Sequence, residues 1–142
     1  MERLRRRDYA ISGETPAQKN SQTFNARTRT MVKSPQFRRW RDSALWQIRA
    51  QGIPERPYPY AEIEMVFVHS DLRRRDGDNQ LSSVQDLLVK AGVILDDCWT
   101  RIGTPRVSHA VGKEARCEIR VFETSPADWK GKILETKKIS AG

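Results

Sequence analysis

Cysteine, histidine and long apolar runs are what this 142-residue chain has least of. Its two cysteines, Cys98 and Cys117, have neither the CxxC spacing of a redox or zinc motif nor the density of a secreted disulfide framework. This scarcity favours a reducing compartment, and we interpret both residues as buried free thiols. No segment approaches the roughly 20 consecutive apolar residues that a bilayer-spanning helix needs, so we expect a soluble protein without a membrane partner.

The N-terminus also lacks the pattern of a secretory signal. The basic residues of segment 1–10 are followed by no apolar run, so the hydrophobic region of such a signal is missing. We therefore expect an intracellular protein. A chain of 142 residues is large enough for one hydrophobic core and too small for two, which predicts a single domain over residues 1–142.

Positive charge is concentrated in the first part of the chain. Residues 1–56 contain 13 Lys and Arg against 5 Asp and Glu, whereas residues 57–142 contain 13 of each, so the net charge of +8 arises entirely from the first segment. Basic surfaces attract polyanions and gain free energy when phosphate counterions are released. The distribution predicts a phosphate-binding part, residues 1–56, and a second part, residues 57–124, in which acids and bases have local roles.

One long helix is expected in the basic part. Residues 1–33 have weak apolar periodicity, which is typical of an extended strand followed by a flexible basic loop that contributes little to a core. Ser34 and Pro35 form a helix start signal, and Gly52 is the stop. The flank of this helix that faces away from its apolar residues is basic, and we expect it to contact phosphate. Its residues are Arg38, Arg39, Arg41 and Arg49.

A strand and a second helix are expected next. Alternating apolar residues identify a strand over residues 61–70. The inward face of this strand includes His69, which we interpret as a hydrogen-bonded structural histidine. Apolar residues at helical spacing then predict a helix over residues 79–91, ended by Gly92 in a left-handed conformation.

Two further strands complete the predicted sheet. Segments 106–110 and 116–123 alternate apolar and polar residues and are expected to form a hairpin. The Lys-rich tail, residues 125–142, has few apolar anchors and is compatible with flexibility. Together these segments predict an α+β fold with a small mixed or antiparallel sheet flanked by about two helices.

Two pairs of acidic residues bracket the second predicted helix. Asp76 and Asp78 precede it, and in an extended backbone their side chains point to the same face because strand side chains alternate with a period of two. Asp96 and Asp97 follow the helix. The helix is roughly 18–20 Å long, and the extended segment 92–97 can retrace roughly 16 Å of it, which would bring the two pairs together.

Converging carboxylates indicate a metal site. Three or four such groups repel one another unless a cation lies between them, and hard oxygen ligands select Mg²⁺ or Mn²⁺. A metal held in this way can activate water for phosphodiester hydrolysis. The alternative is that residues 76–79 form a surface turn and residues 96–97 a solvated loop. An EF-hand calcium loop is excluded, because it needs glycine at Leu81 and glutamate at Leu87.

At this point the sequence resembles the RusA family of Holliday junction endonucleases. The resemblance rests on an Arg-rich run, a D-x-D-N motif, a short helix and an apolar-D-D motif, with weaker agreement in the N-terminal half. The residues that carry it are Arg73-Arg74-Arg75, Asp76-Gly77-Asp78-Asn79 and Leu95-Asp96-Asp97, and, in the N-terminal half, Lys19, Asn20, Lys33, Ser34, Phe37 and Trp40.

The resemblance implies an α+β homodimer that resolves four-way DNA junctions and related branched DNA in recombination and repair. It implies that Asp76, Asp78 and Asp97 are catalytic carboxylates that bind Mg²⁺, for which Mn²⁺ substitutes, with Asp96 as a further metal ligand and Asn79 as a supporting residue. A two-fold dimer suits a junction that needs paired incisions. A cytoplasmic protein of bacterial or phage origin is expected. The residues expected to contact DNA are Arg73, Arg74, Arg75, Arg38, Arg39 and Lys19.

One position departs from the family pattern. Family members carry a lysine four residues after the second motif aspartate, where this chain has Ser82. Such a lysine would neutralise charge that develops on the phosphate in the transition state, and serine cannot replace a cation. Lys113, Lys90 or one of the arginines 73–75 could substitute from another direction, and the sequence does not choose among them.

Three interpretations therefore stay open. The first is a metal-dependent nuclease for junctions or branched DNA. The second is a non-catalytic protein that binds branched DNA through a degenerate active site, since the lysine is missing. The third is a structural or interaction protein that binds an acidic protein or RNA, with its aspartates merely on turns. Cleavage selects the first interpretation, and junction binding without cleavage selects the second. Weak salt dependence of DNA binding favours the third.

Overall fold

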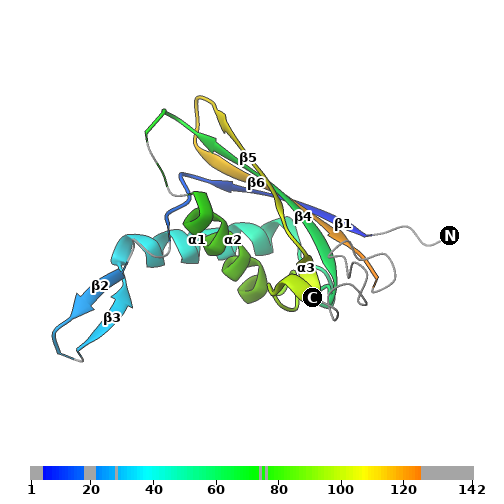
Figure 1. Cartoon of the computed structure of the whole chain (residues 1–142), viewed down its shortest axis with the longest axis horizontal. Helices are drawn as coiled ribbons and strands as arrows, with labels where there is room; N and C mark the ends of the chain where they lie inside the picture. Colours follow the sequence, from blue (N-terminus) through cyan, green and yellow to red (C-terminus); the bar gives the residue numbers. More distant parts are fainter. Residues whose placement is uncertain (1–4, 18–21, 28, 74, 76, 126–142) are drawn as a thin grey trace, which may run out of the picture.

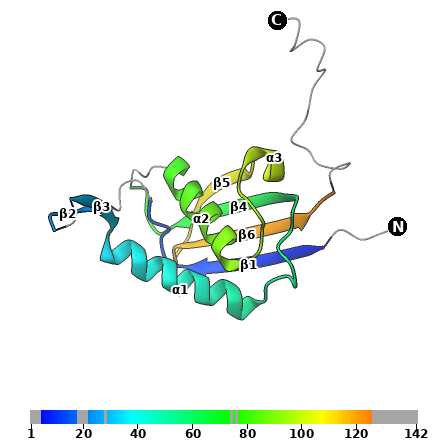
Figure 2. The same cartoon turned by 90° about the horizontal axis from the view of Figure 1, so that it is seen from below.

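A four-stranded sheet with helices on one face forms the body of the protein, seen from two directions in the computed structural model of Figures 1 and 2. The structure describes residues 5–17, 22–27, 29–73, 75 and 77–125, without the side chains of residues 22–25, 30–33, 78 and 79. Most of the predicted tail lies outside the described residues, and so do three residues with a predicted role in the site, Lys19, Arg74 and Asp76. The α+β prediction is confirmed.

The sheet is mixed, with one parallel and two antiparallel strand pairs. Its strands in spatial order are β1 (Arg6–Ser12), β6 (Arg116–Glu123), β4 (Ala61–His69) and β5 (Arg106–Val111), and a separate antiparallel pair comprises β2 (Gln22–Asn25) and β3 (Thr30–Lys33). The central strand β4 pairs antiparallel with β6, with Ile63 opposite Val121, and parallel with β5, with Phe67 opposite His109. The predicted alternation of inward and outward residues along β4 and β6 is confirmed.

The predicted hairpin between the last two strands is wrong, because β4 lies between β5 and β6. The backbone N–H of Gly112 donates to the carbonyl of His69 at 2.9 Å, so the chain leaving β5 passes the end of β4. It then returns along the far side of β4 as β6. A short Gly-containing connection is compatible with either arrangement, and the sequence pattern alone could not distinguish them.

The first 33 residues contain more structure than their sequence predicts. The expected strand is present as β1, but it contributes Tyr9 and Ile11 to the core, where little contribution was expected. The hydroxyl of Tyr9 donates to the carbonyl of Gly52 at 2.9 Å, which ties β1 to the end of the first helix, and burial raises the pKa of Tyr9 to about 12. In place of a loop, the next segment contains β2 and β3.

Helix α1 (Pro35–Gln51) begins and ends where its capping residues predict. The hydroxyl of Ser34 accepts a hydrogen bond from the backbone N–H of Phe37 at 3.1 Å, and Gly52 ends the helix with a φ of 98°. Its buried face, which includes Ala44 and Ile48, lies against β1 and the second helix. Arg38 and Arg39 are exposed on the other side, as predicted.

Helix α2 (Gly77–Ala91) starts two residues earlier than predicted, and a short helix α3 (Trp99–Ile102) follows. Because Gly77 and Asp78 already belong to α2, the extended backbone expected for the D-x-D-N motif is not present at these two residues. Gly92 ends α2 with the predicted left-handed φ of 85°. No helix among the described residues is long and apolar enough to cross a membrane.

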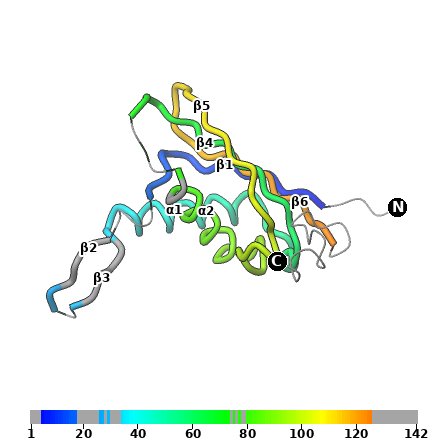
Figure 3. The backbone as a smooth tube through the Cα atoms, in the orientation of Figure 1, coloured from blue at the N-terminus to red at the C-terminus, as the bar shows by residue number. Residues whose placement is uncertain are grey.

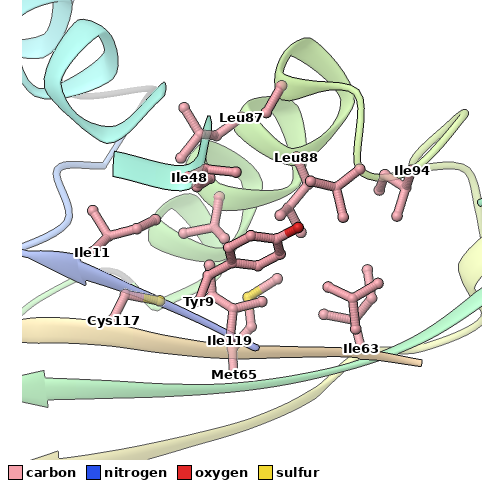
Figure 4. Close-up of a cluster of buried hydrophobic side chains, with 14 of the residues drawn as sticks. Tyr9, Ile11, Ile48, Ile63, Met65, Leu87, Leu88, Ile94, Cys117 and Ile119 are labelled. Carbon is pink, nitrogen blue, oxygen red and sulfur yellow. The ribbon is translucent and has the colours of Figure 1, made fainter. Parts of the chain in front are cut away.

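Side chains from the sheet and from α1 and α2 meet in one core. Figure 4 shows Met65 and Ile119 rising from the strands towards Ile48, Leu87 and Leu88 on the helices. The tube in Figure 3 shows that both helices lie on the same side of the sheet. The opposite face carries charged pairs instead, including the ion pairs of Glu64 with Arg106 and Arg120.

The two cysteines differ in environment. Cys117 is buried in the core, as predicted, and this burial raises the pKa of its thiol to about 12. Cys98 is exposed just before α3, so the prediction of a buried thiol is wrong there. The reason is that the chain at this point has left the core and forms a turn.

The folded protein should therefore react with a thiol reagent at one cysteine only. At pH 8 we expect 5,5′-dithiobis(2-nitrobenzoic acid) to release one equivalent of thionitrobenzoate from the native chain and two in denaturant, because the thiolate and not the thiol is the nucleophile. Cys98→Ser should abolish the native reaction, and Cys117→Ser should leave it unchanged. Rapid release of two equivalents from the native protein would contradict the placement of Cys117.

Candidate functional site

Polar side chains gather where β4 ends, beside an open hollow of about 420 Å³. Four segments meet here: residues 13–17 after β1, the end of β4 with residues 70–73 and 75 after it, the start of α2, and β5. The walls of the hollow include His69, Arg73, Arg75, Gly77 and His109. The site therefore adjoins the D-x-D-N motif, to which Gly77 belongs.

The carboxylate of Glu14 connects three of these segments. It accepts hydrogen bonds from Nδ1 of His69 at 2.9 Å and from Nε2 of Gln80 at 3.1 Å, and it forms an ion pair with Nε of Arg75 at 2.8 Å. Gly13 helps to place it, since its backbone N–H donates to the carbonyl of Ala115 at 2.9 Å. Glu14 thus links the end of β1 to β4 and to the first turn of α2.

Arg75 lies between two carboxylates. Besides Glu14, its Nη2 donates to Oδ1 of Asp71 at 2.7 Å, and its side chain is only 19% exposed. The backbone N–H of Arg73 also donates to Asp71, and these two hydrogen bonds hold the pKa of the Asp71 carboxyl below its ordinary value. The guanidinium of Arg75 is therefore held inside the site, whereas the side chain of Arg73 is 83% exposed.

The two histidines of the chain are in contact. His69 is buried and shares a 2.9 Å hydrogen bond between its Nε2 and Nδ1 of His109, and the two rings are nearly parallel, with centroids 5.2 Å apart. The ring of Phe67 stacks against His109 at 5.5 Å. The interpretation of His69 as a hydrogen-bonded histidine is confirmed, and the partners that the sequence did not identify are Glu14 and His109.

His109 reaches the backbone of the D-x-D-N motif. A Cβ atom added to Gly77 would lie 3.2 Å from Nε2 of His109, which is tighter than ordinary van der Waals contact. Only glycine allows this close approach without displacement of the ring. Asp76 lies outside the described residues, and for Asp78 and Asn79 the structure describes the backbone, in the first turn of α2, and not the side chains.

The second acidic pair lies beside the start of β4. The backbone N–H of Leu95 donates to the carbonyl of Tyr58 at 3.0 Å, just before β4 begins. Asp96 accepts a hydrogen bond from the backbone N–H of Cys98 at 3.2 Å and so stabilises the turn before α3. Asp97 is exposed.

Within one chain, residues 77–79 of the first motif and the segment that leads to Asp96 and Asp97 are therefore at opposite ends of the same helix. The part of α2 after Asn79 spans roughly 18 Å at the rise of an α-helix. The expected return of segment 92–97 along α2 is wrong, because this segment pairs with Tyr58 and buries Val93 and Ile94 there. Figure 2 shows α2 running from the end of β4 back towards its beginning.

The carboxylate set still fits a hard divalent cation by its chemistry. Carboxylate oxygens are the ligands that Mg²⁺ prefers, and Asp76, Asp78, Asp96 and Asp97 supply them. In the described part of the chain, which leaves out Asp76 and the side chain of Asp78, no three acidic, histidine or cysteine side chains converge on one point as metal ligands do.

The cationic side chains considered as substitutes for the missing lysine lie in different places. Ser82 is exposed on α2, one turn beyond Asp78. Lys90 pairs with Asp86 at 3.2 Å in the last turn of α2, at the end remote from the D-x-D-N motif. Lys113 is exposed in the connection after β5, at the end of the sheet where the hollow lies.

Comparison with known proteins assigns the family. A family model described as "Endodeoxyribonuclease RusA" matches residues 13–122, which include Glu14, both histidines and both acidic motifs. The chain belongs to the RusA family. One RusA relative, "Crossover junction endodeoxyribonuclease RusA" of Aquifex aeolicus (strain VF5), is 28% identical over 82 residues, or 58% of this chain. The match spans 65% of the length of that RusA protein.

Sequence reasoning missed four residues of this site, Glu14, Asp71, Gln80 and His109. The sequence carries a signal for two of them, Glu14 and His109. Glu14 is an isolated acid in a basic segment, and His109 is the second of only two histidines in the chain. The sequence alone does not show that His109 lies close to His69. The parallel pairing of β5 with β4 places His109 beside Phe67 and close to His69.

Gln80 offers a test of how this network contributes to stability. Its buried side chain donates to the carbonyl of Thr15 at 2.7 Å as well as to Glu14. Gln80→Ala leaves that carbonyl without its donor, so we expect the free energy of unfolding to fall by about 1–3 kcal/mol in urea denaturation. Gln85→Ala, half-buried on the same helix, should cost clearly less, and equal losses for both variants would contradict the role of Gln80.

Proposed function

We propose that this protein is a metal-dependent endonuclease that resolves four-way DNA junctions and related branched DNA in recombination and repair. The observation that carries the proposal is the RusA family match over residues 13–122, which spans both acidic motifs. The basic first part of the chain supports it, because a surplus of Lys and Arg favours binding to phosphate. The exposed Arg38, Arg39 and Arg73 are the described residues best placed for such contacts.

The proposed metal ligands are Asp76, Asp78 and Asp97, with Asp96 beside them and Asn79 in support. Mg²⁺ is the proposed cofactor, and Mn²⁺ should replace it because both prefer oxygen ligands. When bound, the metal would supply Lewis-acid stabilisation of the phosphate and activation of water. The chain itself contributes the geometry: α2 fixes Asp78 in its first turn, and the pairing with Tyr58 fixes the segment that precedes Asp97.

We further propose that two copies of the chain complete each site. The length of α2, roughly 20 Å, supports this arrangement, because it separates Asp97 from the D-x-D-N motif of its own chain. In a two-fold dimer, Asp97 of one copy would lie beside Asp76 and Asp78 of the other. Such a dimer has two identical sites, which suits the paired incisions that a four-way junction requires.

A mixing experiment tests the function and the dimer together. Asp78→Asn and Asp97→Asn should each abolish cleavage of a labelled four-way junction in Mg²⁺. A heterodimer of the two variants regains one intact site, since one copy supplies Asp76 with Asp78 and the other supplies Asp97. After unfolding and refolding of an equimolar mixture, we expect about one quarter of the wild-type rate from random pairing of subunits.

The control for this experiment is Asp42→Asn, which changes an exposed aspartate on α1 and should cut like the wild type. Failure of the mixture to regain activity, with both variants folded and dimeric, would contradict a site shared between chains. Cleavage at the wild-type rate by Asp78→Asn alone would contradict the proposed nuclease site itself.

A second candidate function rests on Ser82. Its position one turn after Asp78 lacks the lysine expected in the family pattern, so the chain could bind branched DNA without efficient cleavage. This reading predicts tight, salt-dependent junction binding without nicking by the wild type, and nicking after Ser82→Lys. Junction-specific nicking by the wild type would exclude it.

A further inference from the structure

We propose that His109 is a catalytic residue of the nuclease site, whose Nε2 accepts the proton of the attacking water, and that His69 and Glu14 are positioning residues behind it. The inference rests on the proposed function, because it assigns a role within that reaction. It is carried by a continuous line of hydrogen bonds from Glu14 through His69 to His109, whose Nε2 faces the position that a Cβ atom on Gly77 would occupy.

The end of this line lies at the motif that is proposed to bind the metal. Nε2 of His109 would be 3.2 Å from a Cβ atom on Gly77, and Gly77 stands between Asp76 and Asp78 in the sequence. His109 and Gly77 also line the same open hollow, so solvent and substrate have access to the ring. His109 is exposed on an edge strand, whereas His69 is buried behind it.

Hydrogen-bond geometry specifies which ring nitrogens carry protons. Glu14 forms an ion pair with Arg75, and an ionised carboxylate only accepts hydrogen bonds, so Nδ1 of His69 must donate to it. When His69 is neutral, its Nε2 is then an acceptor, and Nδ1 of His109 must donate across the 2.9 Å contact. This leaves a free electron pair on Nε2 of His109, directed to the Gly77 side.

The same contacts explain where the charge goes when His109 takes up a proton. Protonation at Nε2 allows the Nδ1 proton of His109 to pass to Nε2 of His69. The positive charge then lies on His69, next to the Glu14 carboxylate, which is held in turn by Arg75 and Gln80. A carboxylate that orients and stabilises an imidazole in this way is a known means of making it an effective base.

The proposed step is hydrolysis of a phosphodiester by water. The water oxygen forms a bond to phosphorus while one water proton moves to Nε2 of His109. The bond between phosphorus and the 3′ oxygen breaks, and its electron pair stays on that oxygen, which takes a proton from solvent. His109 then returns its proton to solvent. The products are a 5′-phosphate and a 3′-hydroxyl, and no oxidant or reductant is needed.

The two histidines would also replace the cation that the family pattern places at Ser82. No cation is available from Ser82, and Arg75 is held by Glu14 and Asp71. After proton transfer, the His69–His109 pair carries one positive charge on the β4 and β5 side of the site, where it offsets part of the negative charge that develops in the transition state. The cation would thus arise during the reaction from β4 and β5 and not from α2.

Three variants separate a base from a structural residue. His109→Ala removes the ring, and His109→Asn keeps an N–H near the position of Nδ1 that can still donate to His69. Both should lower the single-turnover rate of junction cleavage by about 100-fold or more, with the dissociation constant for the junction unchanged within about 2-fold. Added imidazole should restore part of the rate of His109→Ala. Ser108→Ala, on the other face of the same strand, is the matched control and should cut like the wild type.

The positioning residues are tested in the same assay. His69→Gln and Glu14→Gln should slow cleavage by about 10- to 100-fold without weakening junction binding, since they orient the base and do not contact the phosphate. In the free wild-type protein, long-range ¹H–¹⁵N spectra at a pH where both rings are neutral should show both histidines protonated on Nδ1. The opposite tautomer for His109 would overturn the assignment.

The outcomes distinguish this inference from the function on which it rests. If the wild type and both His109 variants cut the junction equally fast, the role of His109 is overturned and the nuclease stands. If His109→Ala is slow because it binds the junction poorly, or if imidazole does not restore it, His109 is structural and the inference is likewise overturned. If the wild type and Ser108→Ala both fail to cut, the proposed function fails, and the catalytic role of His109 fails with it.

Discussion

The carboxylate of Glu14 is the contact on which the arrangement of the site depends. It binds His69 at the end of β4, Arg75 in the following loop and Gln80 in the first turn of α2, so a single side chain sets three segments against the end of β1. A partly buried carboxylate is stable there because His69 and Gln80 donate hydrogen bonds to it and Arg75 forms an ion pair with it. The start of α2, and with it the D-x-D-N motif, takes its position from this contact.

Helix α2 sets the distance between the two acidic motifs of one chain. It carries the D-x-D-N motif at one end and leads at the other to Asp96 and Asp97, which the pairing with Tyr58 holds by the start of β4. A rigid helix cannot bring its two ends together. This separation is the reason for the proposal that two copies of the chain, related by a two-fold axis, complete each site.

Local signals in the sequence were sufficient for much of the fold and insufficient for the site. Ser34 and Gly52 delimit α1 because capping is a local property, and the alternation in β4 reports a single buried face. The spatial order of the strands is not a local property. A short connection between β5 and β6 can join two neighbouring strands as a hairpin, or it can pass the end of β4 and join the strands on either side of it. For this reason the sequence did not predict that His109 would bond to His69. It also predicted Asp97 beside a motif that lies at the other end of α2.

The pattern of nicks in a four-way junction is the most direct test of whether the chain cuts branched DNA at a metal site. With each strand labelled in turn, we expect two nicks, symmetrically placed in opposite strands, in Mg²⁺ and none in EDTA. A linear duplex of the same sequence should remain intact. Equal cutting of the linear duplex, or nicks that persist in EDTA, would show that the chain is not a metal-dependent junction nuclease.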